Sequence, residues 1–180
     1  MRFHAVSGTA ARRRTDCAIV GIHENGGLAA SAVPLDARLS GRLARLAKRG
    51  DLRGRIGETT LLDVDGGPCR RVLVVGIGSK GALTRKQYKK AMLAAATALV
   101  RSGARDAVSF LSLETVSATD SYYRGRLAAE AVGHALYRVP AIRSTRPPKP
   151  PVLAAFAITV QNRSQVADAN RGAETKIGGL

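Results

Sequence analysis

The sequence is poor in aromatic residues and contains no long apolar run. The first shortage limits which residues can build the core, and the second excludes a membrane-spanning protein. Aromatic residues make up 4% of the 180 residues and Trp is absent, so the core has to be built from Leu, Val, Ile and Ala. No apolar run reaches the roughly 18 residues of a membrane-spanning helix, so we expect no membrane partner. The first residues also lack the apolar stretch of a secretory signal. These absences favour a cytoplasmic protein.

Metal-binding and nucleophilic motifs are also missing. Cys17 and Cys69 are the only cysteines, and both lie in apolar, strand-like segments that suit buried, reduced thiols. His4, His23 and His134 share no metal-ligand spacing, and neither cysteine has a C-x-x-C partner. No G-x-S-x-G or H-E-x-x-H motif occurs. We therefore expect no catalytic residue, no metal site and no cofactor in this chain.

Basic residues are abundant, with 29 Lys and Arg against 13 Asp and Glu, a net charge of +16. This excess fits either a solvated arginine-rich surface or a phosphate-bearing partner such as DNA. One cluster falls in the first turns of an expected helix, where cations oppose the macrodipole unless an anion binds there. A second is a run in an expected loop. The candidate nucleic-acid contacts are Lys80, Arg85, Lys86, Lys89 and Lys90, with Arg12, Arg13 and Arg14.

Hydrophobic periodicity predicts alternating strands and helices. Strands are expected at about 3–6, 16–22, 59–64, 70–75, 107–113 and 152–160. Helices are expected at about 34–49, 84–102, 121–137 and 164–177. We interpret the proline-rich stretch 140–151 as a loop rather than a domain linker, because a strand follows it. The alternation predicts an α/β domain of three layers with a mixed sheet flanked by helices.

A glycine motif, Gly76-Ile77-Gly78-Ser79-Lys80-Gly81, follows an expected strand. In dinucleotide-binding proteins the G-x-G-x-x-G spacing brings backbone N–H groups against a pyrophosphate. Here the helix begins only at a T-x-x-Q capping box, Thr84 to Gln87, and no acidic residue stands about twenty positions further on. The motif therefore favours a strand-to-helix loop that needs positive φ. A nucleotide-type ligand at Gly76, Gly78 and Gly81 is the alternative.

Several segments in order resemble the N-terminal region of bacterial leucyl aminopeptidases, the cytosol aminopeptidase family. One is Thr15-Asp16-Cys17-Ala18-Ile19-Val20-Gly21, and another is the basic, glycine-rich passage 47–59. The strand 71–78 followed by 83–90 makes a third, and 130–137 leading into the final strand makes a fourth. No single motif is diagnostic, whereas the order of all four covers nearly the whole chain.

The resemblance implies a macro-like domain over residues 1–162, with 163–180 starting a linker helix towards a catalytic domain that this chain lacks. It implies a cytoplasmic, homohexameric parent enzyme that removes N-terminal residues with two divalent metals, Mn or Zn, in its C-terminal half. The family's N-T-D-A-E-G-R signature has no counterpart here, so none of its catalytic residues can be placed on this sequence. Some bacterial members also bind DNA. The expected role is a non-catalytic domain that serves assembly and DNA binding, and the alternative is a stand-alone nucleotide-binding module.

Overall fold

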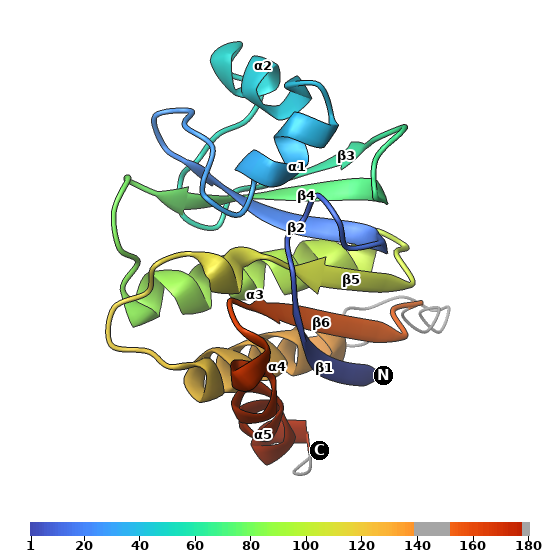
Figure 1. Ribbon diagram of the computed structural model, residues 1–180, viewed down its shortest axis with the longest axis vertical. Coiled ribbons are helices and arrows are strands. Elements are labelled where there is room, and N and C mark those ends of the chain that lie inside the picture. The colour runs from blue at the N-terminus through green and yellow to red at the C-terminus, as the bar shows by residue number, and fades with distance from the viewer. Residues whose placement is uncertain (139–151, 178–180) are drawn as a thin grey trace.

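A six-stranded sheet runs through the middle of the protein, with helices on both of its faces (Figure 1). The computed structural model describes residues 1–138 and 152–177. The strand order is β1-β6-β5-β2-β4-β3, and only β3 is antiparallel to its neighbour. The strands are β1 (Arg2–Ser7), β2 (Thr15–His23), β3 (Thr59–Asp63), β4 (Cys69–Gly78), β5 (Asp106–Ser109) and β6 (Ala155–Val160). The mixed sheet and the α/β class are confirmed.

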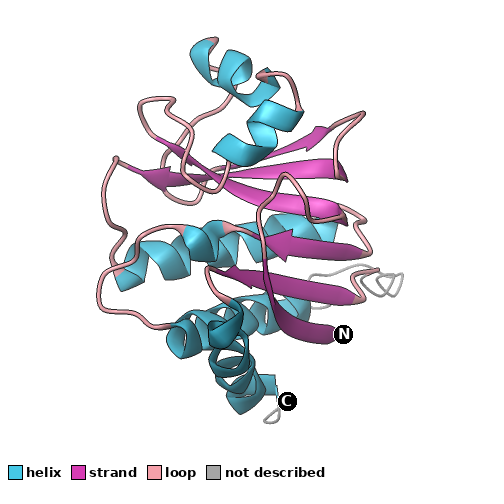
Figure 2. Ribbon diagram, in the orientation of Figure 1, coloured by secondary structure: helices cyan, strands magenta, loops and turns pink. Residues whose placement is uncertain are grey.

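Two hydrophobic cores form because each face of the sheet has its own helices (Figure 2). On one face lie the short helices α1 (Val33–Arg38) and α2 (Arg42–Lys48). The other face is covered by α3 (Arg85–Arg101) and α4 (Ser121–Arg138), and α5 (Val166–Ile177) packs across α4 beside β1. Continuous apolar runs in the central strands are explained by this burial on both faces. Among the described residues, no helix is both long and apolar enough to cross a membrane.

Helix α3 follows its sequence pattern closely. Its predicted apolar stripe is buried, with every member 0–1% exposed: Tyr88, Met92, Ala95, Ala96 and Leu99. The predicted capping box is also present, since Gln87 N donates to Thr84 Oγ1 at 3.2 Å and Thr84 N donates to Gln87 Oε1 at 2.9 Å. Local sequence and tertiary packing agree here, so the start of this helix is well defined.

The single helix expected at 34–49 is wrong, because the chain forms α1 and α2 with a sharp turn between them. Ser40 and Gly41 both adopt positive φ, 53° and 74°, which ends the first helix. Asp36 Oδ1 then accepts hydrogen bonds from Leu43 N at 2.7 Å and from Ala44 N at 3.3 Å. The buried carboxylate therefore caps the second helix from within the first.

The strand expected at 107–113 is also shorter, since β5 ends at Ser109. Phe110 leaves the extended conformation with φ −96° and ψ 0°, and a 3₁₀ turn, η1 (Leu111–Leu113), follows. The apolar run continues because this turn still faces the core. The last strand begins at Ala155, and a 3₁₀ turn, η3 (Arg163–Gln165), precedes α5. The expected proline-rich loop 140–151 lies outside the described residues.

Helices α4 and α5 cross unusually closely because each contributes a glycine to the contact. A Cβ placed on Gly125 would lie 2.1 Å from Ala169 O, and one on Gly172 would lie 1.9 Å from Tyr122 O. No larger residue fits either position without separating the helices. This crossing holds α5 against the sheet domain.

Candidate nucleic-acid interface

At the glycine motif that ends β4, another segment of the protein's own backbone packs where a ligand would have to lie. The segment that precedes β3 runs alongside it, with Gly78 N donating to Gly54 O at 2.7 Å and Gly57 N donating to Gly76 O at 3.0 Å. A Cβ on Gly76 would lie only 2.0 Å from Arg55 O. Gly78 also needs its positive φ of 81°. Chain packing and backbone conformation therefore explain these glycines without a phosphate.

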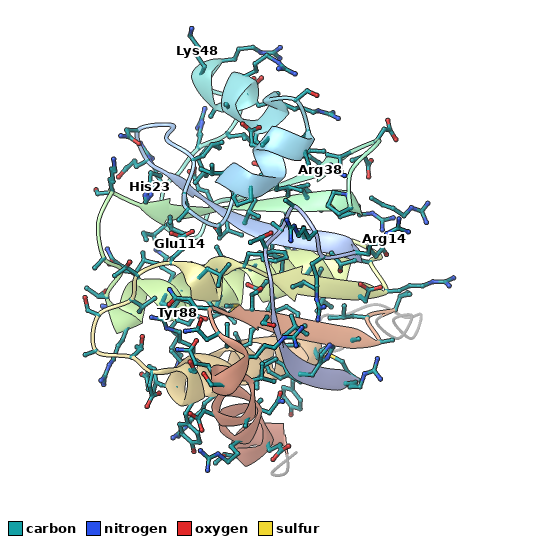
Figure 3. The ribbon with its side chains drawn as sticks, viewed as in Figure 1. Arg14, His23, Arg38, Lys48, Tyr88 and Glu114 are labelled. Atoms are coloured by element: carbon teal, nitrogen blue, oxygen red, sulfur yellow. The ribbon has the colours of Figure 1, made fainter. Side chains whose placement is uncertain are left out.

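The crevice between the carboxyl ends of β2 and β5 is closed as well. In open α/β sheets, ligands bind where neighbouring strands send their connections to opposite faces, and β2 and β5 do so here. Glu114 fills this place, 7% exposed, with its Oε1 accepting from Ser31 N at 2.7 Å (Figure 3). Ser31 Oγ in turn accepts from Gly21 N at 3.0 Å. A buried carboxylate in this crevice disfavours the phosphates of a nucleotide.

Two of the five basic candidates around the start of α3 are held by neighbouring groups. The Arg85 guanidinium donates to Ala118 O, with Nε at 2.9 Å, and lies 4.9 Å from the centre of the Tyr123 ring. Lys89 Nζ forms an ion pair with Glu130 at 3.0 Å. Both side chains fasten α3 to the α4 side of the domain. Lys80, Lys86 and Lys90 are exposed and form no ion pair among the described residues.

The structure adds two arginines that sequence reasoning missed. Because Gly54 is hydrogen-bonded to Gly78, Arg53 and Arg55 are exposed next to the strand end that carries Lys80. The side chain of Lys90 lies against the same loop, with its Cε 3.4 Å from where a Cβ on Gly57 would sit. The only local signal was the pair of glycine-rich stretches that meet here. We name the resulting set the strand-end basic surface: Arg53, Arg55, Lys80, Lys86 and Lys90.

The predicted run of Arg12, Arg13 and Arg14 lies at the other end of the sheet. Arg14 directly precedes β2, whereas Lys80 follows the carboxyl end of the parallel β4. Nine residues of β2 separate the two ends by about 26 Å, and Figure 3 shows Arg14 and His23 at opposite ends of that strand. The two basic runs therefore do not form one surface.

The cysteines and histidines show no arrangement suited to chemistry. Cys17 and Cys69 are buried free thiols, and burial raises the pKa of Cys17 to about 12 and that of Cys69 to about 11. Both therefore stay protonated and weakly nucleophilic near neutral pH. Residues 1–138 and 152–177 hold no group of three His, Cys, Asp or Glu side chains placed to bind a metal.

The strand order and the two helix layers define a macro-like α/β domain. The protein superposes on a crystal structure of a Trypanosoma brucei macrodomain with a TM-score of 0.70, at 13% identity over 94% of this chain and 65% of that one. A mutant of tomato leucine aminopeptidase gives a TM-score of 0.72, at 21% identity over 98% of this chain and 36% of that one. Both likenesses concern the fold.

Sequence comparison assigns the family. Residues 19–146 match the model of the "Cytosol aminopeptidase family, N-terminal domain". A probable cytosol aminopeptidase of Actinobacillus pleuropneumoniae serotype 5b (strain L20) is 35% identical over 97% of this chain, and one of Halorhodospira halophila (strain DSM 244 / SL1) is 38% identical over 84%. The chain spans about a third of the length of these relatives, 35% and 31%. It belongs to the cytosol aminopeptidase family and corresponds to its N-terminal domain.

Proposed function

We propose that this chain is the non-catalytic N-terminal domain of a leucyl aminopeptidase, a metallo-exopeptidase whose chemistry lies in the part of the relatives that this chain does not match. The observation that carries the proposal is the match of nearly the whole chain to about a third of those relatives. The described residues offer no metal-ligand group for the two divalent ions, Mn or Zn, that the parent would use. Residues 1–162 would form the domain, and 163–180 would start the connection to the catalytic part.

Activity measurements test this division of labour. The purified 180-residue chain, supplied with Mn²⁺ or Zn²⁺, should hydrolyse leucine p-nitroanilide no faster than buffer containing the same metal. The full-length relative from Actinobacillus pleuropneumoniae serves as the positive control. Metal-dependent release of nitroaniline by the chain alone, abolished by a chelator, would place catalytic residues within it and refute the proposal.

The parent would be a cytosolic homohexamer in which this domain contributes to assembly. The proposal rests on the family membership and on the relatives' name, cytosol aminopeptidase. Analytical ultracentrifugation of the full-length relative and of a version without residues equivalent to 1–162 tests the assembly role. Loss of the hexamer in the shortened protein is expected, and an intact hexamer would contradict it.

We further propose that the domain binds DNA weakly and without sequence preference through the strand-end basic surface, with Arg12, Arg13 and Arg14 adding charge at the other end. Lys80, Lys86 and Lys90 are exposed and unpaired among the described residues, which leaves them available to phosphates. Few aromatic residues are present for base stacking. Affinity should therefore fall by about one to three decades between about 50 and 200 mM salt.

Charge reversal at the strand-end basic surface tests this interface. Lys86→Glu combined with Lys90→Glu should weaken binding to every duplex sequence alike in an anisotropy titration. Arg12→Glu combined with Arg14→Glu removes the same charge at the opposite end and should weaken binding less. Equal loss in both double variants would mean that net charge alone drives binding, and binding that neither variant nor salt affects would refute the electrostatic account.

The alternative function, a stand-alone module for a nucleotide-type ligand at Gly76, Gly78 and Gly81, has less support. The backbone of Gly54 and Arg55 covers Gly76, the Ile56 side chain lies against Gly78, and Glu114 fills the neighbouring crevice. Calorimetry with ADP-ribose at millimolar concentration should therefore give no heat of binding. Saturable heat that a Glu114→Gln variant increases would instead favour the nucleotide module.

A further inference from the structure

A hollow of about 890 Å³ opens at the amino-terminal end of the parallel strands, away from the strand-end basic surface. Three separate segments wall it: the end of the β1–β2 loop with the start of β2, the turn between β3 and β4 with the start of β4, and the residues around the start of β5. Each contributes at least one arginine to the lining, and the arginines without a protein partner are Arg14, Arg70 and Arg105. Arg70 lies 56 positions after Arg14 along the chain, and Arg105 lies 91 positions after it. They line the same hollow because the sheet aligns the starts of the parallel strands.

The guanidinium groups of these three arginines are available to a ligand. All three residues are exposed, and none of their side chains makes a hydrogen bond or an ion pair among the described residues. Arg71, which also lines the hollow, differs because its Nη1 donates a hydrogen bond to Asp16 Oδ1 at 2.8 Å. Of the four arginines that line the hollow, three are therefore without a protein partner and one is already neutralised.

The carboxylates in the hollow are mostly engaged, and their bonds position the arginines. Asp16 binds Arg71 and also accepts from the backbone N of Arg105 at 2.9 Å. Asp106 Oδ1 accepts from Thr15 Oγ1 at 2.6 Å and from Asp16 N at 3.0 Å. These bonds fix the backbone from which Arg105 projects and the residue next to Arg14, so binding has to order the arginine side chains but not the backbone that carries them.

One carboxylate, Asp65, stays exposed on the rim without a hydrogen-bond or ion-pair partner among the described residues. It is the adverse charge that an anion entering the hollow would meet. Its removal therefore offers a test in the direction opposite to that of removing an arginine.

We propose that this hollow binds a compact chain of linked phosphates, with Arg14, Arg70 and Arg105 as its ligands. A guanidinium offers two parallel N–H donors that match two oxygens of one phosphate. Three such groups around one hollow suit several phosphates held close together, whereas an extended nucleic-acid backbone distributes its phosphates along a surface. The volume lies within the range of small-ligand sites.

Calorimetry with inorganic tripolyphosphate at low salt tests the site on the full 180-residue chain. Arg14→Ala and Arg105→Ala should each weaken binding about tenfold, since each removes a charge-assisted pair of hydrogen bonds. Arg53→Ala is the matched control, because Arg53 is also an exposed arginine but lies at the opposite end of the sheet. It should bind tripolyphosphate like the unchanged chain. Thermal melting checks that each variant remains folded.

Neutralising an acidic residue gives the opposite sign. Asp65→Asn should tighten tripolyphosphate binding, while Glu24→Gln, the same change of charge at the far end, should leave it unaltered. An equal effect of Asp65→Asn and Glu24→Gln, or equal weakening by Arg14→Ala and Arg53→Ala, would reduce the site to the general field of a basic protein and overturn the proposal.

A DNA titration distinguishes a free oligophosphate from a nucleic acid as the source of the phosphates. Arg14→Ala should lower tripolyphosphate affinity while changing DNA affinity little, and Arg53→Ala should do the reverse. Loss of DNA affinity in Arg14→Ala, with no tripolyphosphate binding by the unchanged chain, would make the hollow part of a nucleic-acid surface and overturn the proposal. The proposed DNA interface is tested by its own double variants, so the DNA proposal and the linked-phosphate proposal can each fail without the other.

Discussion

Several glycines in this chain mark places where two stretches of backbone touch. At Gly76 the neighbour is Arg55 O, and at Gly172 it is Tyr122 O, each about 2 Å from where a Cβ would be. The G-x-G-x-x-G spacing is visible in the sequence, but its cause is not, because the touching segment lies some twenty residues away. The same holds for Glu114, whose role depends on meeting Ser31 from a distant loop. Residue patterns alone therefore favoured a loop over a ligand site, but they could not show which segment packs against the glycines.

Replacing Gly172 by Ala should destabilise the protein. Alanine normally stabilises a helix interior by about 1 kcal/mol relative to glycine. Here the methyl group would meet Tyr122 O at 1.9 Å, so the helices must separate, at a net cost of about 1–3 kcal/mol. Urea unfolding measures the change, with the exposed Glu174→Ala on the same helix as a control near zero. A more stable Gly172→Ala variant would show that the crossing is not tight.

His4 should make stability depend on pH. Burial, and then the charges of Arg2 and Arg13, lower its pKa below the ordinary 6.5. Below pH 6.5 the unfolded chain therefore binds more protons than the folded one, and stability falls as the pH drops towards the lowered pKa. When the pH is lowered from about 7.5 to about 5.5, the melting temperature should decrease less for His4→Gln than for the unchanged chain. Parallel losses in both proteins would contradict this contribution.

At the scale of elements, prediction succeeded where local and tertiary signals agree. Helix α3 carries its own capping box and apolar stripe, so its start and buried face could be read directly. The helix expected at 34–49 failed because its leucine spacing continues through the turn, while positive φ at Ser40 and Gly41 breaks it. The strand 107–113 failed because an apolar run looks alike in a strand and in a buried 3₁₀ turn.

The edge of the sheet at β1 is covered by a side chain of α5. Ala5 N donates to Asn170 Oδ1 at 2.7 Å, which satisfies a backbone N–H in a residue only 6% exposed. Asn170→Ala should cost about 1–3 kcal/mol, because the N–H loses its partner without gaining water. Asn170→Asp keeps an acceptor and should cost less in the same denaturant titration. Equal costs would mean that packing, and not this hydrogen bond, ties α5 to the edge.

For the whole molecule, charge placement could not be predicted from charge runs. Arg12, Arg13 and Arg14 fall at the opposite end of the sheet from Lys80 because parallel strands separate their starts from their ends. Arg53 and Arg55 join the strand-end basic surface only through the bond between Gly54 and Gly78. Net charge was known from composition, whereas its division between two ends follows from topology.

The +16 charge should make the folded chain more stable in moderate salt. Repulsion between like charges favours expansion, and salt shortens its reach from about 30 Å at 0.01 M to about 8 Å at 0.15 M. Raising sodium chloride over this range should increase the melting temperature by roughly 2–4 °C, the effect of about 1 kcal/mol in a chain of this size. A falling melting temperature would indicate that surface ion pairs such as Arg49 with Asp51 outweigh the repulsion.

The close crossing of α4 and α5 determines how these two helices open in local unfolding. With Gly125 against Ala169 and Gly172 against Tyr122, neither helix can detach by a small tilt, so both must open together. In native-state hydrogen exchange, amides in the middle of α5 should then exchange at the slow rate of α4 and share its denaturant dependence. A terminal helix held by its side chains alone would instead lose its deuterium first, through local fraying.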